Sequence, residues 1–331
     1  MTAFDVIGIG NAIIDVIATV DDAALTEMEV QKGIMQLVER DRSEFLLAQQ
    51  ARRGKARLVP GGSVANTLAG IGRMGLNTAF IGRVADDELG RSYAEQTEDE
   101  GTRFVNGPVA GGQLPTSRSI IFVTPDGERS MNTYLGISAN LGPNDVDEAI
   151  FAGNKWLFLE GYLFDKPAGK SAFGAAADAC HRAGGKAGIA LSDPFCVDRH
   201  RDDFRRLVAE QMDYVIGNVH EWEALYQTNI DEALRLAVAD CPTVICTRSG
   251  DSALLFRNNQ RVEVPVYRVT PVDATGAGDQ FAAGLIYGLA VGADLETAGR
   301  MAVIAASEVI SHVGARPERD LTEDFRKAGL I

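Results

Sequence analysis

Residues 272–281 read VDATGAGDQF, and residues 282–292 continue as AAGLIYGLAVG, a run of small and apolar residues with helical spacing. A Gly-Ala-Gly turn at the start of a helix presents backbone N–H groups that bind anions, with support from the helix dipole. Asp279 would lie in the first helical turn, where a carboxylate can accept the proton of an attacking hydroxyl. The alternative is a glycine-rich turn in which Asp279 only caps the helix.

Short apolar runs alternate with segments of helical spacing along most of the chain, which predicts a parallel sheet covered by helices on both faces. In such a sheet, ligands bind beyond the carboxyl ends of the strands. The predicted strands lie at 4–10, 79–84, 156–161, 187–193, 213–218 and 243–247.

Two segments, 11–40 and 104–135, break this alternation with extended patterns. The second contains Pro125-Asp126-Gly127, a turn signal between two extended pieces. We expect one domain over 1–331, with these two segments forming a small β-rich lid inserted in the α/β core.

Composition narrows the function classes. The 331 residues carry a formal net charge of −14, which argues against nucleic acid and anionic membranes as partners. No stretch is long and apolar enough to predict a membrane span, and the N-terminus lacks the basic region of a signal peptide. The four cysteines are scattered, which favours a reducing cytoplasm over a disulfide framework or a zinc site.

Three further motifs contain polar groups at the ends of predicted elements. In GGSVAN (61–66), Gly61 and Gly62 would let the backbone approach a ligand closely, and Asn66 can donate and accept hydrogen bonds. The alternative is a plain turn before a buried helix. In GIGNAIIDV (8–16), a dinucleotide fingerprint fails at Ile13, and Asp15 could instead accept two sugar hydroxyls or be a surface-strand residue.

Asn218 and Glu221 follow a predicted strand and open a helix. Their spacing is typical of a capping box, and the functional alternative is a pair that holds Mg²⁺ through water. Arg129, beside the predicted hairpin turn, could clamp a phosphate or simply be solvated. The chain contains no P-loop, no zinc-protease motif and no protein-kinase motif set.

GNAIID, GGSVAN, NVHE and DATGAGD occur in this order over nearly the whole chain, and together they resemble the PfkB/ribokinase family of small-molecule kinases. Val64 and Ala274 are small departures from the family pattern, and neither removes a functional group named above. The resemblance implies a three-layer α/β/α sandwich with a mostly parallel central sheet and a β-rich lid. It also implies ATP and Mg²⁺.

The resemblance further implies roles for individual residues. Asp279 is similar to the family's catalytic base, and the backbone of Gly276, Ala277 and Gly278 to its anion hole. The implied sugar contacts are Asn11, Asp15, Gly61, Gly62 and Asn66, and the implied ATP and Mg²⁺ residues are Asn218, Glu221, Thr247, Gly250 and Thr275. Asp273 matches a position that in some members helps to bind a monovalent cation, so K⁺ is a further candidate ligand.

The lid segment DGERSMNTYLGISANL is more similar to adenosine kinase-type members than to plain sugar kinases. In that subgroup an arginine after the hairpin turn acts at the phosphate, which maps to Arg129. Candidate purine contacts are Met35, Leu37, Met131, Tyr162 and Phe164, and the alternative is that these five side chains belong to the core.

The substrate and the assembly therefore stay open between stated alternatives. The expected reaction is phosphorylation of a nucleoside CH₂OH group, with a ribokinase-, fructokinase- or 2-keto-3-deoxygluconate kinase-type sugar kinase as the alternative. A non-catalytic binding protein and a dehydrogenase are disfavoured, because Asp279 is present and the dinucleotide fingerprint fails. We expect a monomer or a homodimer.

Overall fold

The structure, a computed structural model, describes residues 3–331 and contains a nine-stranded sheet in the order β14-β13-β12-β11-β10-β9-β1-β5-β6. The seven strands from β12 to β6 are parallel, and β13 and β14 complete the sheet as an antiparallel edge. The strands are β1 (Val6–Ile9), β5 (Thr78–Ile81), β6 (Thr102–Phe104), β9 (Trp156–Glu160), β10 (Lys186–Ala190), β11 (Tyr214–Asn218), β12 (Thr243–Arg248), β13 (Asp251–Arg257) and β14 (Gln260–Val264).

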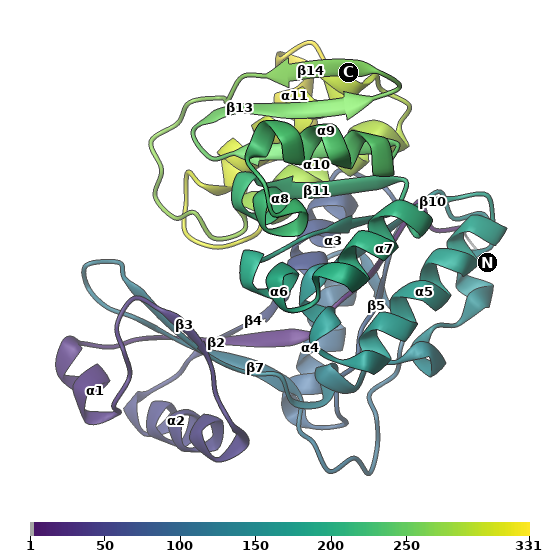
Figure 1. Cartoon of the computed structure of the whole chain (residues 1–331). Helices are drawn as coiled ribbons and strands as arrows, with labels where there is room; N and C mark the ends of the chain where they lie inside the picture. The colour runs from purple at the N-terminus through teal and green to yellow at the C-terminus, as the bar shows by residue number, and fades with distance from the viewer. Residues whose placement is uncertain (1–2) are drawn as a thin grey trace.

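Helices cover both faces of this sheet (Figure 1), because its strands are apolar on both sides. Ile7 and Leu157 point into one core and Val6 and Phe158 into the other, as the alternation of side chains along a strand requires. The first core lies under α5 (Pro167–Arg182), α6 (Pro194–Arg199), α7 (Arg201–Gln211), α8 (Val219–Tyr226) and α9 (Ile230–Asp240); the second lies under α3 (Ser63–Arg73), α4 (Glu88–Asp99), α10 (Ala277–Ala290), α11 (Leu295–Val309) and α12 (Leu321–Lys327). The predicted three-layer fold is confirmed.

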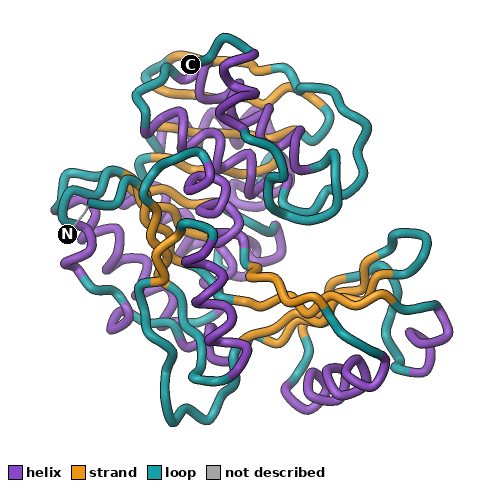
Figure 2. Tube along the Cα trace, turned by 180° about the vertical axis from the view of Figure 1, so that it is seen from behind, coloured by secondary structure: helices purple, strands orange, loops and turns teal. Residues whose placement is uncertain are grey.

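A second, five-stranded sheet projects from this body (Figure 2), with strand order β3-β8-β7-β2-β4. Its elements are β2 (Ile13–Thr19), β3 (Met35–Leu37), β4 (Arg57–Gly61), β7 (Ser117–Val123), β8 (Arg129–Tyr134), α1 (Asp22–Glu27) and α2 (Arg40–Arg53). The outer face of the sheet buries Val16, Ile120 and Phe122 against Leu25 of α1 and Leu46 of α2. The opposite face is called the inner face below.

The predicted boundaries of this second sheet need correction. Its first segment extends to Gly61 through α2 and β4, beyond residue 40, and its second begins at Ser117 because β6 belongs to the main sheet. The predicted hairpin joins β7 and β8 through a turn in which Gly127 donates its N–H to the carbonyl of Thr124 at 2.8 Å.

Four short 3₁₀ segments complete the secondary structure: η1 (Gly136–Asn140), η2 (Pro143–Asp145), η3 (Glu148–Phe151) and η4 (Gly161–Asp165). Within residues 3–331, no helix combines the length and the apolar character needed to cross a membrane.

Candidate active site

The Gly-Ala-Gly turn forms the start of α10. Gly276 is the N-cap residue with φ of 80°, the left-handed region that favours glycine. A Cβ atom on Gly276 would lie 2.6 Å from the Cα of Ala315. Both the positive φ and this close contact therefore exclude a larger residue. A Cβ on Gly278 would meet no atom within 4 Å, because Gly278 lines a cavity. Backbone conformation and packing require glycine at position 276, whereas at position 278 the side-chain position faces open space in the cavity.

The free N–H groups of this turn are not the three predicted from the sequence, which were those of Gly276, Ala277 and Gly278. Ala277 donates its N–H to the carbonyl of Ala274 at 3.2 Å, so that amide is used inside the turn. Within residues 3–331, no acceptor takes the N–H groups of Gly276, Gly278 or Asp279. Three backbone donors at a helix N-terminus are thus open to an anion.

The carboxylate of Asp279 is held by two residues of α3. Ser63 donates its hydroxyl to Oδ1 at 2.7 Å, and Asn66 donates Nδ2 to Oδ2 at 2.9 Å. Burial raises the pKa of Asp279, while these two hydrogen bonds oppose the increase. Ser63 was not predicted from the sequence, although it stands between the predicted Gly62 and Asn66.

Asp279 faces a cavity of about 420 Å³ at the carboxyl ends of the parallel strands, where the fold class predicts a ligand. The other wall includes Asn218 at the end of β11, Glu221 in the first turn of α8 and Thr247 in β12. Thr247 also lines a second cavity of about 410 Å³, together with Gly250 and the apolar side chains of Val266, Phe281, Val303 and Ile310. The predicted ATP residues thus line two cavities that meet at Thr247.

Asn218 and Glu221 form the capping box that their spacing indicated. Asn218 Oδ1 accepts the Glu221 N–H at 3.0 Å, and Glu221 Oε2 accepts the Asn218 N–H at 2.8 Å. Burial raises the pKa of Glu221 to about 7, and Asp193 adds to the increase. A divalent cation beside Glu221 would favour its charged form, and oxygen atoms of carboxylate and amide groups suit Mg²⁺. Residues 3–331 contain no group of three or more metal-ligating side chains, so bound phosphates would have to supply most of the ligands.

Asp15 lies on the inner face of β2, next to Gly61 of the antiparallel partner β4. A Cβ on Gly61 would lie 2.8 Å from Asp15 Oδ2, so the glycine makes room for the carboxylate. Burial raises the pKa of Asp15 to about 7 against the positive charges of Arg129 and Arg316, and no hydrogen bond from residues 3–331 opposes it. The carboxylate is therefore an acceptor without a protein donor.

Asn11 is more constrained than predicted. Its Nδ2 donates to Oε1 of Glu160 at 2.8 Å, and its Oδ1 accepts the hydroxyl of Ser138 at 3.0 Å. Both ends of the amide thus form hydrogen bonds inside the protein. To bind a substrate as well, Asn11 would have to share these hydrogen-bonding groups between the substrate and Glu160 or Ser138. Glu160 itself, 1% exposed at the end of β9, was not predicted, although an acid that ends the run WLFLE is a signal for it.

Arg129 reaches from β8 to the loop before α10. It donates to Asp273 Oδ2 at 2.9 Å and to Thr275 Oγ1 at 3.0 Å. Asp273 also accepts the N–H groups of Gly314 and Thr275, at 3.0 Å each. Its carboxylate is already paired with a guanidinium, so these contacts lend no support to the potassium role, which stays a prediction.

Four of the five candidate purine contacts fall into two groups. Met131 and Tyr162 line the cavity with Asp279, and Met35 and Leu37 are exposed on β3. Met35 pairs with Met131 across the two strands, so both side chains share the inner face.

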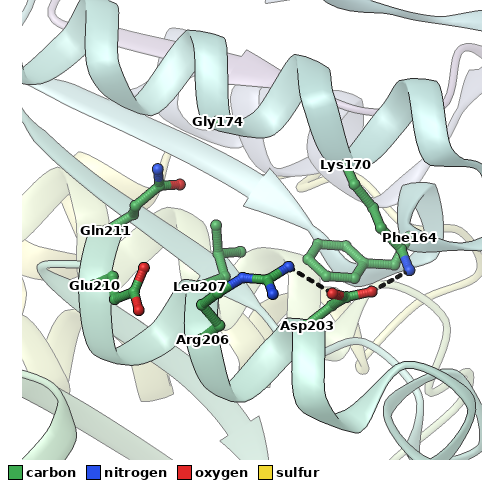
Figure 3. A pocket seen from close by; sticks show the side chains of 8 residues that line it. All are labelled: Phe164, Lys170, Gly174, Asp203, Arg206, Leu207, Glu210 and Gln211. Atoms are coloured by element: carbon green, nitrogen blue, oxygen red, sulfur yellow. Dashed lines mark hydrogen bonds and ion pairs between the residues drawn. The ribbon is translucent and has the colours of Figure 1, made fainter.

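The fifth candidate, Phe164, lies away from the cavity that contains Asp279. Phe164 is 2% exposed and stacks on Phe204 of α7, with ring centroids 4.1 Å apart. It contributes to a different pocket, between α5 and α7, where Asp203 lies between Lys170 and Arg206 (Figure 3). The interpretation of Phe164 as a base contact was wrong, because the side chain is part of the helix-covered core.

Comparison with known proteins bears on the activity. The model of the pfkB family of carbohydrate kinases matches residues 33–321. A fructokinase from Klebsiella pneumoniae is 30% identical over 253 residues, which cover 72% of this chain and 80% of the relative. A 5-dehydro-2-deoxygluconokinase from Geobacillus thermodenitrificans is 29% identical over 280 residues, with 80% and 83% covered.

Two solved structures are similar over almost the entire chain. A probable sugar kinase protein from Rhizobium etli is 40% identical, covers 100% of both chains and superposes with a TM-score of 0.89. An adenosine kinase from Sinorhizobium meliloti is 41% identical, with 99% and 100% covered and a TM-score of 0.87. Because the family model matches residues 33–321, which is most of the sequence, the chain belongs to the pfkB family of carbohydrate kinases.

Proposed function

We propose that this kinase transfers the γ-phosphoryl group of ATP to the CH₂OH hydroxyl of a nucleoside, adenosine or a close relative. The observation that carries the proposal is the position of Asp279, whose carboxylate is oriented by Ser63 and Asn66 beside three free backbone N–H groups. A base and an anion site in contact are the two elements that phosphoryl transfer to an alcohol requires.

In this mechanism the carboxylate of Asp279 accepts the hydroxyl proton as the acceptor oxygen bonds to the γ-phosphorus. The bond from that phosphorus to the β,γ-bridging oxygen breaks, and ADP leaves with the electron pair. The N–H groups of Gly276, Gly278 and Asp279 stabilise the negative charge on the transferred group. Mg²⁺ bound with ATP would be held from the side of Asn218 and Glu221 and would neutralise phosphate charge.

The nucleotide would occupy both cavities described above. The apolar cavity lined by Val266, Phe281 and Val303 would take the adenine of ATP, and Thr247 lies where that cavity joins the one that contains Asp279. Arg129 would then stand beside the transferred phosphoryl group, since it contacts Thr275 at the edge of the anion site.

The inner face of the second sheet supports a nucleoside as acceptor. Asp15 and Ser119 are neighbours on this face, and a carboxylate is a good acceptor for two vicinal hydroxyls of a ribose. The next row of the same face is apolar, and it consists of Ile17, Ile121, Met131 and Met35. A purine would pack against this row, whereas a free sugar offers no flat apolar surface to cover it. The 41% identity to an adenosine kinase adds support.

The second candidate is a sugar kinase. The names of the Klebsiella relative, of the Geobacillus relative and of the Rhizobium structure favour it. In that case Asp15 would still bind sugar hydroxyls, and a group other than a purine would cover the apolar row of Ile17, Ile121, Met131 and Met35.

The test is release of ADP from ATP with Mg²⁺, with adenosine, inosine, guanosine, ribose, fructose and 2-keto-3-deoxygluconate offered one at a time. We expect turnover on adenosine or another nucleoside and little on free sugars. Turnover on a free sugar alone would overturn the nucleoside assignment and leave the role of Asp279 to be tested separately.

A further inference from the structure

Asn66 lies between the proposed base and an arginine that sequence analysis did not single out. Its Nδ2 donates to Asp279 Oδ2 at 2.9 Å, and its Oδ1 accepts a hydrogen bond from Nε of Arg316 at 3.3 Å. Arg316 stands in the loop between α11 and α12, 250 residues from Asn66 in the chain. The side-chain amide of Asn66 thus donates a hydrogen bond to a carboxylate at one end and accepts one from a guanidinium at the other.

The chemistry of the two partners fixes the direction of this amide. A guanidinium only donates hydrogen bonds and a carboxylate only accepts them, so Arg316 selects the oxygen of Asn66 and Asp279 selects the nitrogen. Rotation of the amide by 180° would place N–H groups against the guanidinium and the oxygen against the carboxylate. Either contact alone would bias the amide, and the two together exclude the reversed orientation.

Arg316 is itself held firmly. Its side chain is 12% exposed, its second terminal nitrogen donates to the carbonyl of Pro60 at 2.6 Å, and it forms an ion pair with Glu100 at the end of α4. The preceding residue, Ala315, accepts a hydrogen bond from the side chain of Gln280 on α10 at 3.0 Å. The guanidinium therefore connects β4, α3 and α4 directly behind the site.

We propose that Arg316 is a positioning residue of the phosphoryl-transfer site: through Oδ1 of Asn66 it keeps the Nδ2–H group aimed at Asp279, so that the carboxylate holds the orientation and charge needed to accept the hydroxyl proton. The inference rests on the proposed role of Asp279 as base. It does not depend on whether the acceptor is a nucleoside or a sugar, because Asp279 would accept a hydroxyl proton in either case.

Other charged and polar side chains near Arg316 and Asp279 could also affect the pH dependence of activity. Around Arg316 lie Glu100 and Tyr93 of α4, Asp15 of β2 and Arg73 of α3; around Asp279 lie Ser63, Asn66 and Glu160. Burial raises the pKa of Asp15, and the charge of Arg316 opposes that increase; burial likewise raises the pKa of Asp279, and the hydrogen bonds of Ser63 and Asn66 oppose it. Asn66 is the side chain that contacts both Arg316 and Asp279.

The experiment is a double-mutant cycle of Arg316→Met and Asn66→Ala in the full-length enzyme, with kcat and KM measured from pH 5 to 9 on whichever acceptor is turned over. We expect Arg316→Met to lower kcat by roughly 10- to 100-fold, the range for losing a hydrogen bond to a charged group. We also expect the acid limb of the profile to move to higher pH, because a carboxylate that loses a donor is protonated more easily. In the Asn66→Ala background, Arg316→Met should change kcat and the acid limb little further.

Arg73→Met is the matched control. Arg73 is exposed and donates to the carbonyl of Pro317, so it fastens the same loop one residue further on without touching Asn66. It should leave the acid limb in place. If Arg316 only fastens the loop, Arg73→Met and Arg316→Met will give similar profiles, and the proposal is wrong. Fully additive effects of Arg316→Met and Asn66→Ala would overturn it as well.

Two further variants keep the proposal testable if Arg316→Met folds poorly. Arg316→Met combined with Glu100→Gln removes both charges of the ion pair, and Arg316→Lys keeps a charge but lacks the planar fork that reaches Asn66 and Pro60 together. Full activity of Arg316→Lys would contradict the proposal. If instead Asp279→Asn keeps its activity, the assignment of Asp279 as the base is wrong. The double-mutant cycle would then still measure whether Arg316 and Asn66 act together.

Discussion

Arg129 on β8 of the second sheet and Asp273 in the loop before α10 form an ion pair at 2.9 Å, although 144 residues separate them in the chain. Both side chains are largely buried, with 15% and 12% exposed. The second sheet is thereby attached to the loop that leads into the anion site. A partly buried, charge-assisted pair of this kind is worth more than an exposed one.

We expect Arg129→Met to lower kcat/KM by about 10- to 100-fold, because it removes a charged donor beside the anion site and loosens the contact between the sheet and the loop. Steady-state kinetics with ATP and the acceptor identified in the ADP-release assay would measure the loss. Arg91→Met is the control, since Arg91 forms an ion pair with Asp86 in which both side chains are about half exposed. Equal activities of the two variants would mean that Arg129 has no role at the site.

Asp279→Asn should keep the fold and nucleotide binding and lose roughly 10²- to 10⁴-fold in kcat, the range for removing a general base. The amide keeps the size of the side chain but cannot take up a proton at neutral pH. Circular dichroism and a nucleotide-binding titration would establish that the fold and the ATP site remain. Asp294→Asn is the control, because Asp294 caps α11 and asparagine caps helices equally well. Near wild-type turnover by Asp279→Asn would refute the assignment.

Asp15→Asn should make the free protein more stable above pH 7 and weaken binding of the acceptor. The folded-state pKa of Asp15, about 7, lies above its ordinary value of 3.8. The wild-type protein therefore loses stability as pH rises from about 4 through 7, where the buried carboxyl must ionise, and the asparagine variant does not. The difference should be on the order of 4 kcal/mol at pH 8 and close to zero near pH 4.

Urea unfolding of both proteins at pH 4.5, 6 and 8 would follow this difference. Asp178→Asn, on the exposed side of α5, should show no such dependence on pH. A stability difference that is constant across the three pH values would show that Asp15 does not ionise in this range in the folded protein.

The four cysteines should resist alkylation in the native protein. All are free and buried, and burial raises the pKa of each thiol to about 12. Since the thiolate is the reactive form, iodoacetamide at pH 7.5 should label none of them on the time scale in which it labels all four in urea. Mass spectrometry counts the adducts, and rapid labelling of one native thiol would reveal local opening around it.

Sequence patterns predicted the main sheet better than the second one. The six predicted strands correspond to β1, β5, β9, β10, β11 and β12, since a strand buried on both faces is a continuous apolar run. β6 is three residues long, and the hairpin of β13 and β14 turns at Asn258 and Asn259, both at positive φ, a pair that could have been recognised as a turn. β4 was missed because RLVPG has no strict alternation and contains a proline.

The candidate site shows a similar division. Residues in compact motifs, such as Asp279, Asn66 and Asn218, could be identified from local spacing alone. Arg316 could not, because its importance comes from a contact with Asn66, 250 positions away in the sequence. Glu160 ends an apolar run that could have indicated it, but its partners Asn11 and Val64 lie 149 and 96 positions away. Phe164 was misplaced for a related reason, since a strand end near the site does not determine on which side of the sheet the next aromatic residue packs.

The difference between Gly276 and Gly278 has a practical use. Substitution of Gly276 would collide with Ala315 and harm folding, whereas Gly278 has room for a methyl group on the side of the cavity and none of its backbone strain. Gly278→Ala should therefore leave folding and the inner face of the second sheet intact while it narrows the space next to the backbone donors. We expect this variant to lose turnover while it still binds the acceptor, so it could serve as bait to recover the physiological acceptor from a cell extract.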